Sequence, residues 1–260
     1  MSLKFVFIGA GNLATHLATA LKNQDFEILQ VYSRTQKSAK KLAERIDAEF
    51  TNSLKNISKE ADVYVVAIKD SVYDEVLSQI EFGEKLVVHC SGSMPISALE
   101  NYAENYGVLY PLQTFSKNRE VNFAEIPVFV EASSEKNEKQ IIEIARKISG
   151  SVSALNSEKR LFLHIAAVFA CNFVNHFYSQ ASQVLKSKNI PFDVLKPLIL
   201  ETALKVQEMH PEKAQTGPAV RFDKNVIGKH LQALEFNSQA RELYNSISKS
   251  IFEFHKEINE

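Results

Sequence analysis

The glycine-rich stretch near the start of the chain constrains its fold more than any other segment. An apolar run over residues 4–8 leads into Gly9-Ala10-Gly11, and residues 12–22 continue as an amphipathic pattern. Gly9 permits a tight turn, Gly11 lets the backbone approach a diphosphate, and Ala14 lets the following helix pack closely on the strand. The N-terminus of that helix offers free N–H groups and the positive end of its dipole to phosphates. We therefore expect a strand–turn–helix unit that binds a dinucleotide.

The end of the second predicted strand indicates which dinucleotide is bound. Residues 27–35 read EILQVYSRT, so the strand ends in Ser33, Arg34 and Thr35 without an acidic residue. NAD-binding proteins place an Asp or Glu there for the ribose 2′-hydroxyl, whereas an Arg accommodates a 2′-phosphate and can hold it with two hydrogen bonds. The pattern favours NADP over NAD. In the alternative interpretation, Ser33 or Thr35 caps the next helix and Arg34 is solvated, and both interpretations can hold together.

The rest of the chain divides into two patterns. Strand and helix patterns alternate through the first half, and buried-type runs such as VYVVAI recur, which predicts a doubly wound, mainly parallel α/β sheet of about eight strands. After Leu155, helical periodicity prevails, with one uninterrupted helix expected over residues 157–187 and another that begins at a capping Asp193. We expect a Rossmann-type domain over residues 1–156 and an all-α domain over residues 157–260.

Composition narrows the function classes. The chain has 260 residues and a net charge of −1, so it offers no basic field for nucleic acid. No apolar run approaches the roughly 20 residues of a membrane span, and the first strand starts too early for a signal peptide. The two cysteines, Cys90 and Cys171, are far apart, and neither CxxC nor HExxH occurs. We expect a cytoplasmic protein without a bound metal and without a nucleic-acid or membrane partner.

Ligands of open parallel sheets bind at the carboxyl ends of the strands. The fifth predicted strand ends in His89 and is followed by Ser91-Gly92-Ser93. We expect these three residues to line a ligand cleft, although SGSMP is also an ordinary turn. His89 is a candidate acid or base but more often such a residue serves packing. After the sixth strand, Gln113 and Thr114 either reach a substrate or belong to a loop in which Tyr110 and Pro111 are packed.

The long helix over residues 157–187 is apolar nearly all round, which predicts burial. On a regular helix His164, Asn172 and Asn175 lie on one arc of about 80°. Buried polar side chains need partners, so the arc faces either a ligand cleft between the domains or neighbouring helices. His176 lies off the arc and is expected to be structural, and His16 is expected at the surface or between the domains. Arg221 either attracts an anionic substrate group or pairs with Asp223, which is itself a candidate helix cap.

Several motifs together resemble one family. GAGNLATHLA, YSRT, HCSGSMPISAL, HIAAVFACNF and TGPAVRFD are similar to bacterial NADP oxidoreductases that carry a Rossmann-like domain and a C-terminal domain of unknown function. More distantly, the chain resembles pyrroline-5-carboxylate reductase and the 3-hydroxyisobutyrate and 6-phosphogluconate dehydrogenases. The resemblance implies that the first domain binds NADP and that the helical domain binds substrate and forms a homodimer. The resemblance also implies which residues contact the cofactor: Gly9, Gly11, Asn12, Leu13, Ser33, Arg34 and Ile68. The glycine motif and the end of the second strand add Ala10 and Thr35 to these predicted contacts.

The chain departs from those dehydrogenases at the proton donor. Their long helix carries a catalytic Lys one turn before an Asn, and if Asn172 matches that Asn, the Lys position is Val168. His164 is the natural substitute. We therefore expect an NADP-dependent oxidoreductase that transfers a hydride between NADP(H) and a small C=O or C=N substrate bound between the domains. The alternative is an NADP(H)-responsive binding protein without turnover, and a deazaflavin coenzyme beside NADP is suggested only by the resemblance. The predicted catalytic residues are His164, Asn172 and Ser91, and the predicted substrate contacts are Ser93, Gly92, Arg221 and Asn175.

Overall fold

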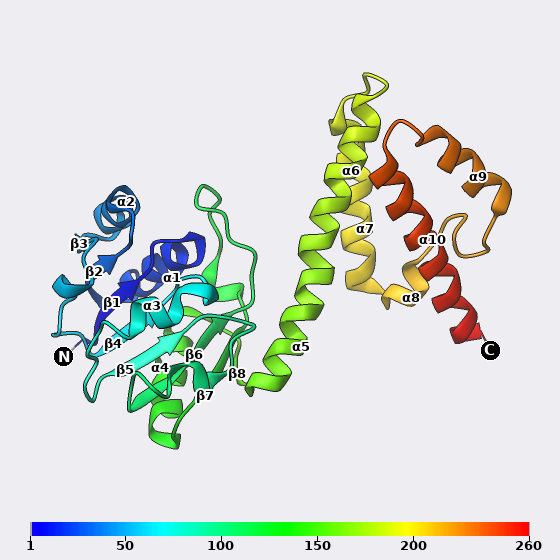
Figure 1. Cartoon of the computed structure of the whole chain (residues 1–260). Helices are drawn as coiled ribbons and strands as arrows, with labels where there is room; N and C mark the ends of the chain where they lie inside the picture. The colour runs from blue at the N-terminus through cyan, green and yellow to red at the C-terminus, as the bar shows by residue number, and fades with distance from the viewer. Residues whose placement is uncertain (1, 260) are drawn as a thin grey trace. The chain divides into compact units, whose positions relative to one another are not determined.

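The computed structural model describes residues 2–259, and it consists of two compact units that meet in sequence between Cys171 and Asn172. Each unit is described by itself. The first contains all strands of the described chain, and the second is helical (Figure 1). The end of the predicted sheet domain, residue 156, is the cap of the first helix that follows the sheet.

An eight-stranded sheet forms the first unit, in the order β3-β2-β1-β4-β5-β6-β7-β8. All neighbouring strands are parallel except β6 and β7, which are antiparallel. The mainly parallel sheet of about eight strands is thus confirmed. The strands are β1 (Lys4–Ile8), β2 (Glu27–Tyr32), β3 (Glu49–Thr51), β4 (Val63–Val66), β5 (Leu86–His89), β6 (Asn105–Pro111), β7 (Val128–Ala132) and β8 (Val152–Ala154).

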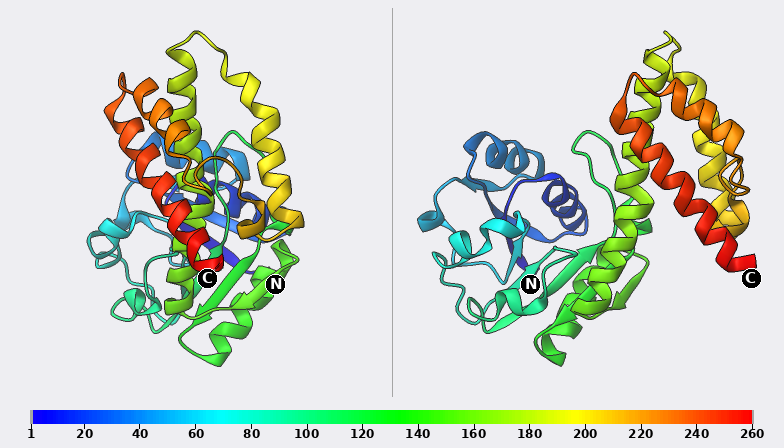
Figure 2. Two further views of the ribbon diagram at one scale, coloured as in Figure 1. Left: turned by 90° about the vertical axis from the view of Figure 1, so that its right-hand side faces the viewer. Right: turned by 45° about the vertical axis from the view of Figure 1, so that its right-hand side comes forward.

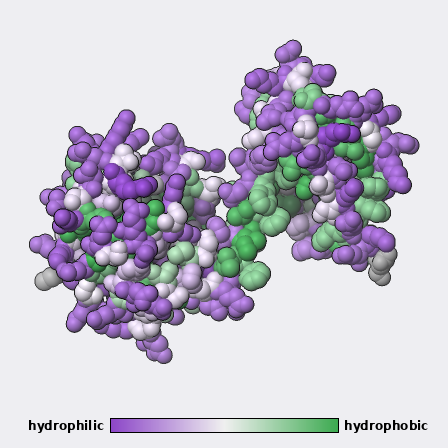
Figure 3. Space-filling view, viewed as in Figure 1, coloured by the Kyte–Doolittle hydropathy of each residue, from purple (hydrophilic) through white to green (hydrophobic). Residues whose placement is uncertain are grey.

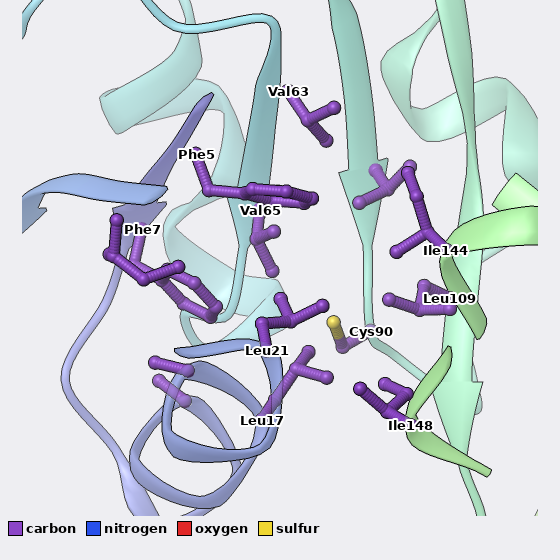
Figure 4. Packing of buried hydrophobic residues seen from close by; sticks show 14 of the residues in the cluster. Phe5, Phe7, Leu17, Leu21, Val63, Val65, Cys90, Leu109, Ile144 and Ile148 are labelled. Atoms are coloured by element: carbon purple, nitrogen blue, oxygen red, sulfur yellow. The ribbon is translucent and has the colours of Figure 1, made fainter. Parts of the chain in front are cut away.

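Helices cover both faces of this sheet, because the strands bury side chains in both directions. Phe5 and Phe7 of β1 pack in one cluster with residues of α1, α2 and α4, whereas Val6 and Ile8 pack in a second cluster with α3. Figure 4 shows the first cluster, with the Cys90 sulfur inside it. The covering helices are α1 (Asn12–Lys22), α2 (Gln36–Ile46), α3 (Tyr73–Leu77) and α4 (Glu135–Ile148).

One long helix runs over Ser157–Lys186, as predicted, but its hydrogen-bond pattern is not uniform. It consists of α5 (Ser157–Ala167), a π-helical segment (Val168–Phe173) and α6 (Val174–Lys186). An apolar run is compatible with either pattern and does not show where i→i+5 bonds replace i→i+4 bonds. The π-helical segment removes the assumption of constant rotation behind the 80° arc.

The remaining helices belong to the second unit. The predicted cap at Asp193 is wrong, since Phe192–Leu195 is a 3₁₀ turn and α7 follows with Leu195 at its N-cap. Figure 2 shows that the chain reverses direction between α6 and α7, through residues 187–191 and the 3₁₀ turn. The helices are α7 (Lys196–Glu208), α8 (Pro211–Ala214), α9 (Lys224–Ala233) and α10 (Ser238–Asn259).

The long helical stretch is not buried within this chain, contrary to the expectation from its composition. Phe162 of α5 is 67% exposed, and Figure 3 shows hydrophobic side chains at the surface along α5. Over Ser157–Lys186 the stretch is also long and apolar enough to span a membrane by length and composition, with mean hydropathy 1.4 and none of that window buried. The statement that no apolar run approaches a membrane span is therefore corrected, although the same properties belong to helices that are covered by protein.

Candidate functional site

The order of the strands reverses between β1 and β4, which is where open α/β sheets bind ligands. Gly9 lies at this point with φ +123°, and a Cβ added there would lie 2.2 Å from the Ala67 carbonyl oxygen and 3.2 Å from Ile68 Cγ2. Only glycine satisfies both the backbone angle and the contact. The turn therefore brings the N-terminus of α1 close to the ends of β1 and β4.

Gly11 is glycine for a different reason. It is the N-cap of α1, it has an ordinary negative φ, and a Cβ added there would meet no atom within 4 Å. Packing within the chain thus does not require glycine here. No side chain caps α1 and its first turn carries no acid, so no side chain of the chain satisfies the first backbone N–H groups at the positive end of the helix dipole. This cradle fits the diphosphate of a dinucleotide.

The residues predicted to select NADP lie at the end of β2. Arg34 and Thr35 are exposed, and Ser33 is half-buried. Thr35 occupies the N-cap of α2, but its side chain makes no capping hydrogen bond there. Thr35 is therefore the N-cap residue, as the alternative predicted, but its side chain does not cap the helix. The Thr35 hydroxyl is left available next to Arg34 in the sequence.

The loop after the sixth strand, in which Gln113 and Thr114 lie, folds over the glycine turn. We call residues 112–122, between β6 and the 3₁₀ turn Phe123–Glu125, the strap. Asn12 Nδ2 donates to the Phe115 carbonyl at 2.8 Å, and Lys117 Nζ donates to the Ala10 carbonyl at 2.8 Å. The strap thus adds a cation to the predicted cofactor site.

His16 belongs to the same contact, and its predicted surface position is wrong. The side chain is 5% exposed, its Nε2 donates to the Ser116 carbonyl at 2.9 Å, and its ring stacks on Phe115 with centroids 5.2 Å apart. The strap covers this face of α1. Sequence periodicity does not predict this contact, because the strap has no periodic pattern of apolar residues.

The second cluster of the site joins the ends of β5 and β6 to α5. Tyr110 Oη lies 3.1 Å from His164 Nδ1, across 54 residues of sequence. A Cβ added to Gly92 would lie 2.6 Å from the His164 ring, so glycine at this position lets the imidazole sit directly on the turn after β5. Burial raises the pKa of Tyr110, partly offset by the nearby Arg160 cation, so the phenol keeps its proton at neutral pH.

The structure brings Ser91, Gly92 and Ser93 together with this pair, but Ser91 also serves the turn. Ser91 Oγ accepts from the backbone N–H groups of Ser93 at 3.2 Å and Met94 at 3.1 Å, and it donates to Asp70 Oδ2 at 3.2 Å. The hydroxyl of Ser93 donates to the same carboxylate at 3.4 Å. The turn predicted as the alternative is present, and Asp70, which follows β4, joins it to the neighbouring strand end.

His89 packs rather than reacts. Its side chain is fully buried, and its Nδ1 accepts from the Ser91 backbone N–H at 3.2 Å. Burial, and secondarily the Arg160 cation, lowers the pKa of His89 to about 3, so the imidazole is neutral.

Arg160 anchors α5 one turn before His164. Its guanidinium is fully buried, pairs with Glu131 of β7, and donates to the Met94 carbonyl at 2.6 Å and to Ser157 Oγ at 3.2 Å. Residues four apart lie on the same face of a helix. The anchored face therefore presents His164 to Tyr110 and Gly92.

The other predicted substrate residues lie in the second unit, where Asn172, Asn175 and Arg221 are exposed. Asp223 Oδ1 accepts from Val226 N at 3.2 Å and caps α9, and no ion pair joins it to Arg221 among the described residues. Asn172 lies within the π-helical segment, together with Val168. Their roles toward a substrate stay predictions.

Within residues 2–259, no group of three or more His, Cys, Asp or Glu side chains is placed to hold a metal ion, and both cysteines are free. Burial raises the pKa of the Cys90 thiol to about 12, so it is inert in the core.

Sequence and structure comparisons agree with this geometry. Residues 4–92 match the family described as NADP oxidoreductase, coenzyme F420-dependent, and residues 126–251 match a domain of unknown function, DUF2520. No curated protein matches the chain. A crystal structure from Bacteroides fragilis, assigned as an NADP oxidoreductase, is 49% identical, with a TM-score of 0.94 over 97% of this chain and 98% of that one.

Two solved structures share the fold at lower identity. An imine reductase from Myxococcus stipitatus in complex with NADP⁺ is 15% identical, with a TM-score of 0.66 over 98% of this chain and 93% of that one. A 1-pyrroline-5-carboxylate reductase from Streptococcus pyogenes is 13% identical, with a TM-score of 0.64 over 97% of this chain and 99% of that one. At 49% identity over nearly the whole length, the Bacteroides protein fixes the family, and this chain belongs to the NADP oxidoreductases that join a Rossmann-type domain to a DUF2520 domain.

Proposed function

We propose that the protein transfers a hydride between NADP(H) and a small substrate with a C=O or C=N group, and that Tyr110 and His164 manage the accompanying proton. The hydrogen-bonded pair of Tyr110 and His164 beside Gly92 carries this proposal. It lies at the carboxyl edge of the sheet, where the glycine turn also lies, because β1, β4, β5 and β6 are parallel.

The cofactor site follows from the open cradle at Gly11. The backbone N–H groups at Asn12 and Leu13 bind the diphosphate, and Gly9 with Ala10 and Ile68 shapes the turn beneath it. Ser33, Arg34 and Thr35 would hold the 2′-phosphate, for which a guanidinium is a suitable partner. When bound, NADPH supplies the hydride.

The proton passes through His164. Tyr110 keeps its proton at neutral pH, and its hydroxyl oxygen accepts a hydrogen bond from Nδ1–H of the protonated His164 ring. As hydride arrives, His164 Nε2 gives its proton to the substrate oxygen or nitrogen, the ring is left neutral and regains a proton from solvent, and Tyr110 holds the ring in that orientation. Ser91 and Ser93 orient the substrate from the turn, and Asn172, Asn175 and Arg221 are the predicted contacts from the helical unit.

The test is substrate-dependent oxidation of NADPH, measured by absorbance with a panel of small cyclic imines and ketones. We expect turnover with wild type, and loss of at least about 100-fold in His164→Ala with unchanged affinity for NADPH. Gly92→Ala displaces the ring and lowers turnover by about 100-fold as well. Gly228→Ala is its control, because a Cβ there meets open space.

The outcomes separate the two functions. Turnover that survives intact in His164→Ala would remove the proton role. Tight NADPH binding without oxidation by any substrate of the panel would favour the binding protein without catalysis.

We also propose that the protein is a homodimer. Large apolar side chains are exposed in both units, with Phe162 at 67%, Leu198 at 62% and Leu200 at 60%. Monomeric soluble proteins rarely expose apolar surface on this scale, and a second copy of the chain offers a matching surface.

A further inference from the structure

A small cavity between α1, α2 and the strap is lined by positive charge. Its volume is about 80 Å³, and Lys41 and Arg45 of α2 and Lys117 of the strap line it. Ser38 and Asn118 add polar groups, and no acidic residue contributes to the lining. Three cations without an acid repel one another across this space, so an anion placed there is stabilised by all three.

The cations are also unpaired within the described chain. Lys41, Arg45 and Lys117 have no carboxylate within ion-pair distance among residues 2–259, whereas the neighbouring Lys40 pairs with Glu44 at 3.7 Å. Lys117 is half-buried, and its Nζ donates to a neutral acceptor, the Ala10 carbonyl, at 2.8 Å. A partly desolvated ammonium with only a carbonyl acceptor gains from an anionic partner.

The size and position of the cavity indicate the kind of anion. Water occupies about 30 Å³ in the liquid, so 80 Å³ holds on the order of two or three waters, which suits a phosphate group and excludes a nucleoside. Ser38 follows Thr35 within the first turn of α2, and Lys117 reaches the glycine turn. The cavity therefore adjoins the proposed cofactor site without including Arg34.

We propose that this cavity binds a phosphate dianion, with Lys117 of the strap, Lys41 and Arg45 as its cationic ligands. The dianion is either the 2′-phosphate of NADP, in which case the inference rests on the proposed function and adds these three cations to Ser33, Arg34 and Thr35 as ligands of that phosphate, or free inorganic phosphate. In both cases Lys117 ties the strap to the anion, so that phosphate binding and the position of the strap over α1 depend on each other.

The experiment measures three ligands against three variants by calorimetry. The ligands are NADPH, NADH and inorganic phosphate, each at constant ionic strength set with chloride. The variants are Lys117→Met, Lys41→Met and Lys40→Met. Each keeps the alkyl stem and removes one charge, and Lys40→Met is the matched control because Lys40 does not line the cavity.

We expect Lys117→Met and Lys41→Met to weaken phosphate-group binding about tenfold or more, and Lys40→Met to leave it unchanged. If the variants lose affinity for NADPH and not for NADH, the dianion is the 2′-phosphate. If they lose affinity for inorganic phosphate and not for either nucleotide, the cavity is a separate anion site.

Two outcomes overturn the proposal. One is equal behaviour of all three variants toward every ligand. The other is an equal loss of affinity for NADPH and NADH, since Lys117 would then bind the diphosphate that both nucleotides share. If neither nucleotide binds to wild type, the proposed cofactor site fails, and inorganic phosphate still decides the inference.

Discussion

At the scale of single residues, two glycines of one motif have different physical roles. Gly9 is required by its own fold, through φ +123° and the carbonyl of Ala67, whereas neither the backbone angle nor the packing of the chain requires glycine at position 11. The motif in the sequence does not separate these roles, because both glycines are part of the same spacing.

A matched pair of substitutions separates the two roles. We expect Gly9→Ala to lower the free energy of unfolding by at least about 2 kcal/mol, since the new Cβ meets backbone at a positive φ. Gly11→Ala is expected to change it by less than about 1 kcal/mol and to weaken NADPH binding at least about tenfold. Urea unfolding and calorimetry measure both. Equal NADPH affinity in wild type and Gly11→Ala would contradict the cradle.

His89 gives a pH dependence whose sign is fixed. Its pKa in the folded protein, about 3, lies below the ordinary value of 6.5, so between these values the unfolded state binds a proton that the native state does not. Stability that is present above pH 6.5 is therefore lost as the pH falls toward 3, by about 1.4 kcal/mol per pH unit.

The measurement compares urea unfolding of wild type and His89→Gln between pH 4 and 7, roughly the window set by these values. Gln keeps an acceptor for the Ser91 N–H and does not titrate. We expect a shallower pH dependence in the variant. Parallel curves would mean that His89 does not carry this proton difference.

Sequence patterns predicted single residues unevenly. The cofactor motif was placed correctly at the N-terminus of α1, because it depends on residues adjacent in sequence. Tyr110 was considered only as a packed residue, since its contact with His164 exists only when α5 lies against β6, 54 residues later.

At the scale of elements, the sheet and most helices followed from periodicity, and α1 has the predicted bounds. The π-helical segment and the strap did not, because neither has a distinctive pattern of apolar residues. π-helical turns occur frequently at functional sites, and the strap brings Lys117 to the glycine turn.

The anchoring of α5 is testable at this scale. Arg160→Met removes one partner of a buried ion pair and leaves Glu131 without its cation. We expect a loss of about 3–5 kcal/mol in the free energy of unfolding, measured by urea. The exposed pair of Lys59 and Glu81 is the control, where Lys59→Met is expected to cost less than about 1 kcal/mol. A similar small cost for Arg160→Met would show that α5 does not depend on this pair.

At the scale of the whole molecule, the apolar composition of the long helix indicates that its surface is buried in a contact. It does not indicate which part of the protein, or which other molecule, makes that contact. A helix that is apolar nearly all round needs more cover than three partner helices give, which favours a second copy of the chain. Large apolar side chains of α5, α6 and α7 are exposed in the single chain. An apolar pattern indicates that a helix face is covered, but it is the same whether the covering residues belong to the same chain or to another.

The homodimer is therefore the prediction that belongs to this scale. We expect light scattering after size exclusion to give twice the mass of the 29.3 kDa chain at micromolar concentration. Phe162→Glu and Leu198→Glu each place a charge on the exposed apolar surface, and both should shift the equilibrium toward monomer, because burying an unpaired charge is costly. Lys188→Glu, on the turn between α6 and α7, is the control and should remain dimeric. A wild-type mass of one chain at these concentrations would refute the dimer, and the apolar surface would then need a different partner.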